Sequence, residues 1–219
     1  MAIRHNRVLQ DIVIGLRWFK AWLRKGFRYS KSEAWKPEDH ELLPLFDVDL
    51  ADALIAVFHD VKSTVDVGCG TGYYAGRFAA MGVDRAVGIE PNPVTGTYLG
   101  GAEAITADVT QEGDLGLGTF DLSMSLEVVE HIPRDRHDAF FDFLCGSATR
   151  YVVFAGGYPG QAGVGHIACR PEAEWEAELN QRGWVRHPHL TNFLRKTAFY
   201  WWSRRNTMVF VPAEQPAEA

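Results

Sequence analysis

Short apolar runs alternate with segments of helical periodicity along most of this chain. The apolar runs are four to six residues long, which is typical of buried strands, and the segments between them repeat apolar residues every three or four positions, as amphipathic helices do. Strands are predicted at residues 64–67, 86–89, 104–107, 120–125, 151–155, 184–187 and 207–211. Helices are predicted at 47–61 (capped by Asp47 or Asp49), 72–80 (closed by Gly82), 134–144, 171–181 and 196–204, with a weak helix after Pro93.

This alternation of strands and helices predicts an α/β fold with a doubly wound, mostly parallel, seven-stranded, Rossmann-like sheet. The last two predicted strands are separated by one helix, which suits an antiparallel pair at the sheet edge. We predict that the 219 residues divide into an N-terminal helical extension (1–46), one α/β domain (47–212) and a disordered tail (213–219).

The N-terminal segment 3–28 has apolar residues at helical spacing with basic residues between them, which indicates an amphipathic helix. Three interpretations stay open for it: a lid over the domain, a homodimer contact, or a helix on a membrane surface, since Trp18 and Trp22 accompany the basic residues. Of these three interpretations of segment 3–28, membrane association is the least favoured. A polar connection follows over residues 29–44.

Charge separates this arm from the rest of the chain. Residues 1–36 hold nine Lys and Arg against Asp11 and Glu33, a balance of +7. Because the net charge of the whole chain is −6, the remaining residues carry −13. An acidic body is a poor platform for DNA or long RNA. Three widely spaced cysteines form no disulfide framework or zinc pattern and favour a cytoplasmic protein. We find no secretory signal or membrane span.

The segment from Asp66 to Gly72, DVGCGTG, joins a predicted strand to a predicted helix. Glycines there allow a sharp turn and close approach to a ligand. Glu90 ends the next strand, where an acid accepts hydrogen bonds from ribose hydroxyls, and Asp108 follows the third strand. A dinucleotide site would have G-x-G-x-x-G; here an acid precedes G-x-G-x-G and would repel a phosphate. The pattern therefore favours S-adenosylmethionine, which carries an ammonium and a sulfonium group.

Together, VDVGCGTG, GIEP, AD and FDLSMSLEVVEHI resemble the class I methyltransferase family over residues 64–155, and more weakly to 211. The resemblance implies S-adenosyl-L-methionine as the cofactor. It implies that the backbone of Gly68, Cys69 and Gly70 holds the methionine portion of the cofactor, and that Glu90 and Asn92 hold its ribose. It also implies that Asp108 and the Val109 backbone hold the adenine, and that Ser125 and Leu126 form the floor below the cofactor. Asp66 either contacts the cofactor or caps the loop.

The fourth predicted strand runs into Glu127, Glu130 and His131, at the sheet edge where ligands of such folds bind. In a helical turn these side chains would share one face and could hold Mg²⁺, Mn²⁺, Fe²⁺ or Zn²⁺. E-x-x-E-H is similar to the motif of two metal-using groups, the O-methyltransferase of ubiquinone biosynthesis and the enzyme that methylates small-RNA 3′ ends; by the latter resemblance His166 is a further ligand. A metal-free catalytic His131, assisted by Glu127 and His166, and a purely structural motif are the alternatives.

An alcohol needs a base or a metal to lose its proton, so both catalytic interpretations favour O-methylation. The sequence around residues 165–184 is similar to methyltransferases of glycan and secondary-metabolite clusters, which indicates a biosynthetic enzyme acting on a hydroxylated small molecule such as a sugar. We expect the glycine-rich loop 156–169 and the arm to contribute to the acceptor pocket. The aromatic residues Tyr158, Trp175 and those at 199–202 either stack on the acceptor or pack in the core or at an interface, and packing is the favoured interpretation. The alternatives are N-methylation, 2′-O-methylation of an RNA end, and a non-catalytic subunit.

Overall fold

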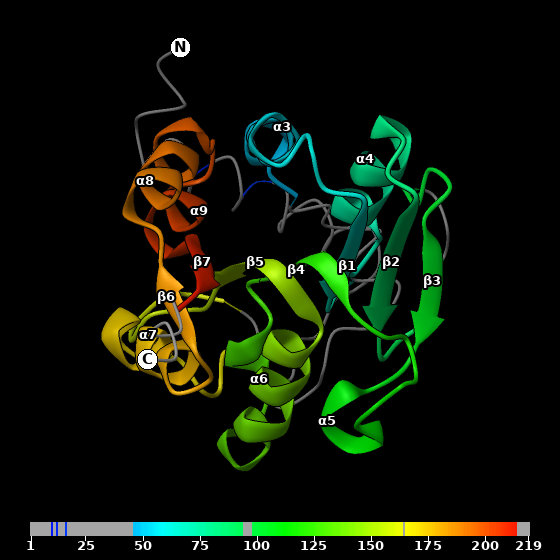
Figure 1. Ribbon diagram of the computed structural model, residues 1–219. Helices are drawn as coiled ribbons and strands as arrows, with labels where there is room; N and C mark the ends of the chain where they lie inside the picture. The colour runs from blue at the N-terminus through cyan, green and yellow to red at the C-terminus, as the bar shows by residue number, and fades with distance from the viewer. Residues whose placement is uncertain are drawn as a thin grey trace, which may run out of the picture.

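The computed structural model describes residues 46–93, 98–163 and 165–213, together with Gln10, Ile12 and Leu16. A seven-stranded sheet of order β3-β2-β1-β4-β5-β7-β6 forms its centre (Figure 1). The first five strands are parallel, and β7 lies antiparallel between β5 and β6. The predicted α/β fold with a mostly parallel sheet is confirmed. In chain order the strands are β1 (Ser63–Val67), β2 (Arg85–Glu90), β3 (Glu103–Thr106), β4 (Phe120–Leu126), β5 (Ala148–Ala155), β6 (Trp184–Arg186) and β7 (Met208–Pro212).

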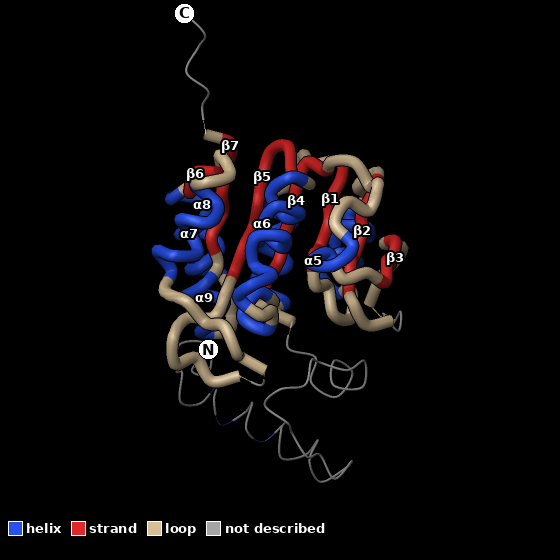
Figure 2. The backbone as a smooth tube through the Cα atoms, turned by 90° about the horizontal axis from the view of Figure 1, so that it is seen from below, coloured by secondary structure: helices blue, strands red, loops and turns tan. Residues whose placement is uncertain are grey.

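Helices cover both faces of this sheet. Figure 2 shows α5, α6 and α7 along one face, and α3, α4 and α8 pack on the other. The helices are α3 (Val48–Val57), α4 (Tyr73–Met81), α5 (Val109–Glu112), α6 (His137–Gly146), α7 (Glu172–Asn180), α8 (Pro188–Thr197) and α9 (Trp201–Asn206), with 3₁₀ turns η2 (Val129–His131) and η3 (Arg134–Arg136). A doubly wound sheet of this kind presents the carboxyl ends of its parallel strands at one edge.

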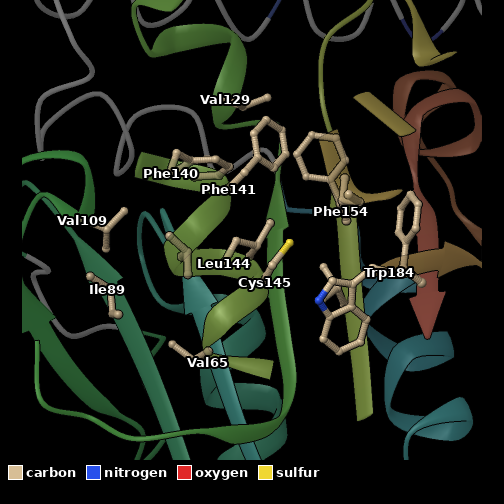
Figure 3. Packing of buried hydrophobic residues seen from close by; sticks show 14 of the residues in the cluster. Val65, Ile89, Val109, Val129, Phe140, Phe141, Leu144, Cys145, Phe154 and Trp184 are labelled. Atoms are coloured by element: carbon tan, nitrogen blue, oxygen red, sulfur yellow. The ribbon is translucent and has the colours of Figure 1, made fainter. Parts of the chain in front are cut away.

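The larger apolar core lies between the sheet and α6 (Figure 3). Val65 and Ile89 from the strands meet Phe140 and Leu144 from α6, and all four are at most 1% exposed. Burying each such side chain contributes about 1.5–3 kcal/mol, so this core fixes how the strands sit relative to one another. It therefore also fixes the loops that leave β1, β2 and β4.

Two predicted helices differ from those observed. The helix capped by Asp47 ends at Val57 rather than Val61, because Phe58 leaves the helical backbone (φ −103°, ψ 35°) and packs into the core. The single helix predicted at 196–204 is wrong, since two helices, α8 and α9, occupy residues 188–206. His187 caps α8 by accepting a hydrogen bond from the Leu190 amide at 3.3 Å, and Pro188 takes the first helical position, which suits proline.

The amphipathic arm and the weak helix after Pro93 fall mostly outside the described residues. Of the arm, Gln10 is helical and buried; its side chain donates to the Phe199 carbonyl at 2.8 Å and accepts from the Trp201 amide at 3.0 Å. This contact ties the arm to the start of α9. At the other end of the chain, the Ala213 amide donates to the Gly183 carbonyl at 2.8 Å, and the rest of the predicted tail, 214–219, lies outside the described residues. No helix among the described residues is long and apolar enough to cross a bilayer.

Candidate functional site

Three glycines turn the chain between β1 and α4. Gly68, Gly70 and Gly72 have φ values of 77°, 55° and 78°, in the left-handed region that residues with a Cβ rarely adopt. The amides of Gly68 and Cys69 both donate to the Ile89 carbonyl, at 2.8 and 3.0 Å. The predicted glycine loop thus exists and is anchored on β2.

Only the backbone of Cys69 is available to a ligand in this loop. Its sulfur packs over β2, because a Cβ built at Gly88 would lie 2.8 Å from Cys69 Sγ. Burial raises the pKa of the Cys69 thiol far above its usual range. Cys69 is therefore a packing residue whose side chain supplies no nucleophile.

Glu90 faces the glycine loop from the end of β2. Its carboxylate is 6% exposed and accepts a hydrogen bond from the Gly70 amide at 3.0 Å. The side chain of Asn92 donates to the other carboxylate oxygen at 3.2 Å. The structure therefore brings together the acid, the amide and the loop that the sequence predicted as neighbours.

Asp66 lies beneath the same loop and is 2% exposed. One of its carboxylate oxygens, Oδ2, has no hydrogen-bond partner among the described residues. Burial, and then the negative charge of Glu90, raise the pKa of Asp66 to about 7. A buried carboxyl group of this kind would gain a partner from a cation placed at the loop.

Asp108 begins α5 and caps it. Its carboxylate accepts hydrogen bonds from the Thr110 amide at 3.0 Å and the Thr110 hydroxyl at 2.6 Å. Burial opposes ionisation, but the hydrogen bonds from Thr110 and Gln111 keep the pKa of Asp108 below its ordinary value. Val109 is 5% exposed in the core, so of its groups the backbone is the one suited to a ligand.

The two floor residues of β4 have different surroundings. Ser125 is fully buried and its hydroxyl donates to the Val67 carbonyl at 2.7 Å, which links β4 to β1 below the glycine loop. Leu126 is half-buried against the core beneath α3 and α8. Ser125 therefore lies directly below the start of the glycine loop, and the role of both residues as a cofactor floor stays a prediction.

Glu127 corrects the prediction of one helical turn through the E-x-x-E-H motif. Its φ is 58°, a left-handed conformation that excludes it from a helix, and the 3₁₀ turn covers only Val129–His131. Its carboxylate accepts hydrogen bonds from Asn206 Nδ2 at 2.7 Å and from Gln161 Nε2 at 2.5 Å. Glu127 therefore points toward α9 and the loop after β5, and does not share a helix face with His131.

Glu130, His131 and His166 come together around the 3₁₀ turn η2. One ligand atom of each lies within 4.8 Å of the others, and the two imidazole rings meet edge to face with centroids 4.9 Å apart. The backbone carbonyl of Glu130 accepts from the amides of Ile167 and Ala168, at 2.9 and 3.0 Å, which holds the His166 loop in place. The predicted neighbourhood of these three residues is thus present in the fold.

The carboxylate of Glu130 is completely buried and neither oxygen has a hydrogen-bond partner among the described residues. His166 Nε2 lies 3.9 Å from Glu130 Oε1, beyond hydrogen-bond distance. Burial, and then the Glu127 charge, raise the pKa of Glu130 well above its ordinary value, while burial lowers that of His166.

Two further histidines lie in different surroundings, one in the core and one at the surface. His137 is buried with Nε2 3.0 Å from the Ile132 carbonyl, and His189 is exposed. Among the aromatic residues, Trp175 is 1% exposed and donates to the Gly157 carbonyl at 3.1 Å, which makes it mainly a core residue.

A cavity of about 330 Å³ opens next to Asn206, beside the Glu127 network. The guanidinium of Arg205 lies 3.6 Å from the centre of the Tyr158 ring at its edge. Gln161, Arg205 and Asn206 were missed by sequence reasoning, because ordinary polar residues in a loop and a short helix carry no motif. The lining residues are Gly156, Tyr158, Pro159, Pro171, Glu172, Trp175, Arg205, Asn206 and Met208.

Comparison with known proteins agrees with this geometry. Residues 65–144 match the family described as "Methyltransferase domain". No curated protein matches the chain significantly. Among solved structures, CalS10, an amino pentose methyltransferase from Micromonospora echinaspora, is 18% identical over 90% of this chain and 97% of its own, with a TM-score of 0.58.

Two further solved structures share the fold. The sugar N-methyltransferase KedS8 from Streptoalloteichus is 15% identical over 90% of this chain and 93% of its own, with a TM-score of 0.57. An O-methyltransferase from a polyketide synthase of Brevibacillus brevis is 16% identical over 81% of this chain and 76% of its own, with a TM-score of 0.55. At these identities the likeness establishes the fold.

Proposed function

Because this chain belongs to the class I methyltransferase family, we propose that it transfers a methyl group from S-adenosylmethionine to a hydroxyl group of a small molecule. One observation carries the cofactor assignment: the left-handed loop Gly68–Gly72 is bounded by two buried carboxyl groups, Asp66 and Glu90. This is a cradle for a cationic ligand that carries no phosphate.

The residues present fit S-adenosylmethionine. Glu90 would accept hydrogen bonds from the ribose hydroxyls, with Asn92 beside it, while one of its oxygens accepts from the Gly70 amide at 3.0 Å in this structure. Asp66 supplies negative charge below the ammonium end. The backbone of Gly68–Gly70 holds the methionine portion, and Asp108 with the Val109 amide receives the adenine. Ser125 and Leu126 form the floor.

When bound, S-adenosylmethionine would supply a methyl group attached to a positively charged sulfur. The acceptor oxygen would attack the methyl carbon in line with the carbon–sulfur bond, and the sulfur would leave as part of S-adenosylhomocysteine. The protein aligns the two reactants and removes the hydroxyl proton. In this proposal His131 takes that proton at a ring nitrogen, and His166, packed edge-on against it, orients the ring. Glu127 acts as a positioning residue, because it holds Gln161 and Asn206 rather than facing His131.

The acceptor enters the cavity beside Asn206, where Tyr158 and Arg205 form one wall. An aromatic ring with a guanidinium and an amide suits a sugar or another hydroxylated metabolite, whose faces stack and whose hydroxyls accept hydrogen bonds. CalS10 and KedS8 are described as sugar methyltransferases, which supports a sugar acceptor. The three cysteines are free, which accords with a cytoplasmic enzyme.

N-methylation of an amino sugar is the second candidate, since KedS8 is described as a sugar N-methyltransferase. An amine needs less help in losing a proton than an alcohol, so it would make less use of His131 and His166. Methylation of an RNA end is less favoured because the chain beyond residue 36 is strongly acidic.

Calorimetric titration with S-adenosylmethionine tests the cofactor assignment. We expect one binding site, and at least tenfold weaker binding in Glu90→Ala, because an acid that accepts two hydroxyls is lost. Glu103→Ala, an exposed acid on the neighbouring strand β3, should bind normally. Absence of binding, or equal loss in both variants, would contradict the proposal.

Methyl transfer from labelled cofactor to matched pairs of hydroxy and amino sugars then distinguishes the two acceptors. O-methylation predicts product from the hydroxy sugar and a severe loss in His131→Ala. Product from the amino sugar alone would establish the second candidate. Arg205→Gln should raise the KM for the acceptor several-fold and leave cofactor affinity unchanged, because Arg205 lines the cavity away from the glycine loop.

A further inference from the structure

The buried carboxylate of Glu130 is the least explained charged group of the described chain. It is 0% exposed, and no donor among the described residues reaches either oxygen. A buried carboxyl group without a partner is destabilising unless it is protonated or neutralised by a cation. The imidazole of His166 stands next to it, with Nε2 3.9 Å from Glu130 Oε1, and the Glu127 carboxylate is close enough for its charge to raise the pKa of Glu130.

We propose that Glu130, His131 and His166 bind a divalent transition-metal ion. One ligand atom from each residue lies within 4.8 Å of the others, a spacing that an ion at 2.0–2.2 Å from each ligand could bridge after a small adjustment. Two neutral imidazoles and one carboxylate are the ligand set of Zn²⁺, Fe²⁺ and Mn²⁺ sites with open positions. Mg²⁺, which prefers oxygen ligands, fits this set less well.

Glycines leave room around the ligand atoms. A Cβ at Gly157 would lie 3.1 Å from Glu130 Oε1, and a Cβ at Gly163 would lie 2.0 Å from His166 Nε2. The backbone of the loop after β5 therefore comes close to two of the three ligands. Carbonyl contacts from Glu130 to Ile167 and Ala168 hold His166 at this distance, which limits the reorganisation that metal binding would require.

Glu127 is not among the residues whose ligand atoms gather within 4.8 Å of one another, in contrast to the sequence-based prediction of four ligands. Its two carboxylate oxygens accept hydrogen bonds, one from Asn206 and the other from Gln161. Its backbone is left-handed, with a φ of 58°. The proposed site therefore uses three ligands, and Glu127 is assigned to holding the loop after β5.

A metal at this position would give the proposed methyltransferase a Lewis acid beside the acceptor hydroxyl. This consequence rests on the proposed function, but binding of the metal does not. Titration of chelator-treated full-length protein with Zn²⁺ or Co²⁺, without S-adenosylmethionine, therefore tests the site independently of methyl transfer.

We expect one Zn²⁺ or Co²⁺ per chain, a Co²⁺ visible absorption band from nitrogen ligands, and a rise in the unfolding temperature with Zn²⁺. Glu130→Gln and His166→Gln should each weaken binding at least tenfold and abolish the thermal shift. Glu127→Gln should change metal affinity by less than threefold, and His189→Gln, an exposed histidine, should not change it.

Glu130→Gln replaces a buried ionisable group without a hydrogen-bond partner by a neutral amide of the same shape, so its metal-free form should unfold at the same temperature as the parent or higher. This separates loss of a ligand from loss of the fold. The proposal is overturned if neither ion binds with saturation, if His189→Gln loses as much affinity as His166→Gln, or if Glu127→Gln loses as much as Glu130→Gln. Normal S-adenosylmethionine binding in those cases would leave the proposed function standing.

Discussion

Val128 lies directly against the α-carbon of Gly68. A Cβ built at Gly68 would come within 2.5 Å of Val128 Cγ2, and Gly68 also has a φ of 77°. The loop after β1, proposed to hold the cofactor, is therefore packed on the turn after β4 that carries Glu130 and His131. Neither loop can shift without the other.

Gly68→Ala should consequently damage both the fold and the cofactor site. The left-handed backbone costs an added Cβ about 1–2 kcal/mol, and the clash with Val128 adds about 1–3 kcal/mol. We expect lower stability in urea unfolding and at least tenfold weaker S-adenosylmethionine binding. Gly82→Ala is the matched control, with a φ of 90° and no atom within 4 Å of the new Cβ. If both variants lost equal stability and bound the cofactor equally well, the packing role of Val128 would be disproved.

Asp66 should make stability depend on pH in a defined direction. Its pKa in the folded protein is about 7, above the ordinary value of an aspartate side chain, so the folded state keeps a proton that the unfolded chain releases. The contribution of Asp66 to stability is therefore greatest below about pH 4, falls as the pH rises toward 7, and is level above that, with a total loss of about 4 kcal/mol from this group. Asp66→Asn lacks the titrating group and should lack this component.

Urea unfolding of the parent and Asp66→Asn at several pH values measures the difference. The stability of the variant relative to the parent should increase between about pH 4 and 7 and then stay constant. The other titrating groups are shared by the two proteins, and those that do not interact with Asp66 cancel; Glu90, whose charge acts on Asp66, is the exception. A stability difference that does not change with pH would show that Asp66 titrates alike in the folded and unfolded chains.

Asn206 holds the loop after β5 against the end of β4. Its side-chain amide donates to Glu127 at 2.7 Å and to Gln161 at 2.8 Å, and it is 4% exposed. Asn206→Ala removes both bonds and leaves the Glu127 carboxylate with one partner fewer, a loss of about 1–3 kcal/mol. Hydrogen exchange should then speed up at residues 156–163. Asn180→Ala, at the exposed end of α7, should leave exchange there unchanged; equal effects of the two would argue against this network.

Much of the proposed cofactor site could be predicted because most of its residues lie at or directly after the end of a strand that the local sequence pattern predicts. The turn at Gly68–Gly72 and the acid at Glu90 are linked by strand order, and parallel strands bring the ends of β1 and β2 together. The fold follows from the same periodicity. The exception is α8, whose start at His187 and Pro188 was read as the end of a strand.

The acceptor side was predictable only in part, since its contacts join distant segments. Glu127 meets Gln161, 34 residues away, and Asn206, 79 residues away, through polar side chains without a motif. The left-handed backbone of Glu127 also has no sequence signal, because strain of this kind is stabilised by tertiary contacts rather than by residue type. Local spacing alone predicts one helical turn through E-x-x-E-H. The prediction is wrong because tertiary contacts hold Glu127 in a left-handed conformation.

Gly163 determines where the His166 ring can lie. A Cβ at residue 163 would fall 2.0 Å from His166 Nε2 and 2.3 Å from its Cε1, so Gly163→Ala must displace the imidazole. The ring cannot simply rotate in place, because it packs edge-on against His131 and its Nδ1 lies 3.6 Å from Cys169 Sγ. The variant should therefore lose Zn²⁺ affinity about as much as His166→Gln, roughly tenfold or more, while S-adenosylmethionine affinity stays within twofold of the parent.

Gly146→Ala is the control for this substitution, because it ends α6 with no atom within 4 Å of the new Cβ. Alanine there should raise stability by about 0.5–1 kcal/mol, since it is the better helix former, and leave Zn²⁺ affinity alone. Calorimetry with Zn²⁺ and with S-adenosylmethionine on both variants gives the comparison. If Gly163→Ala binds Zn²⁺ as the parent does, the position of the His166 imidazole does not depend on Gly163, and this argument for His166 as a ligand is contradicted.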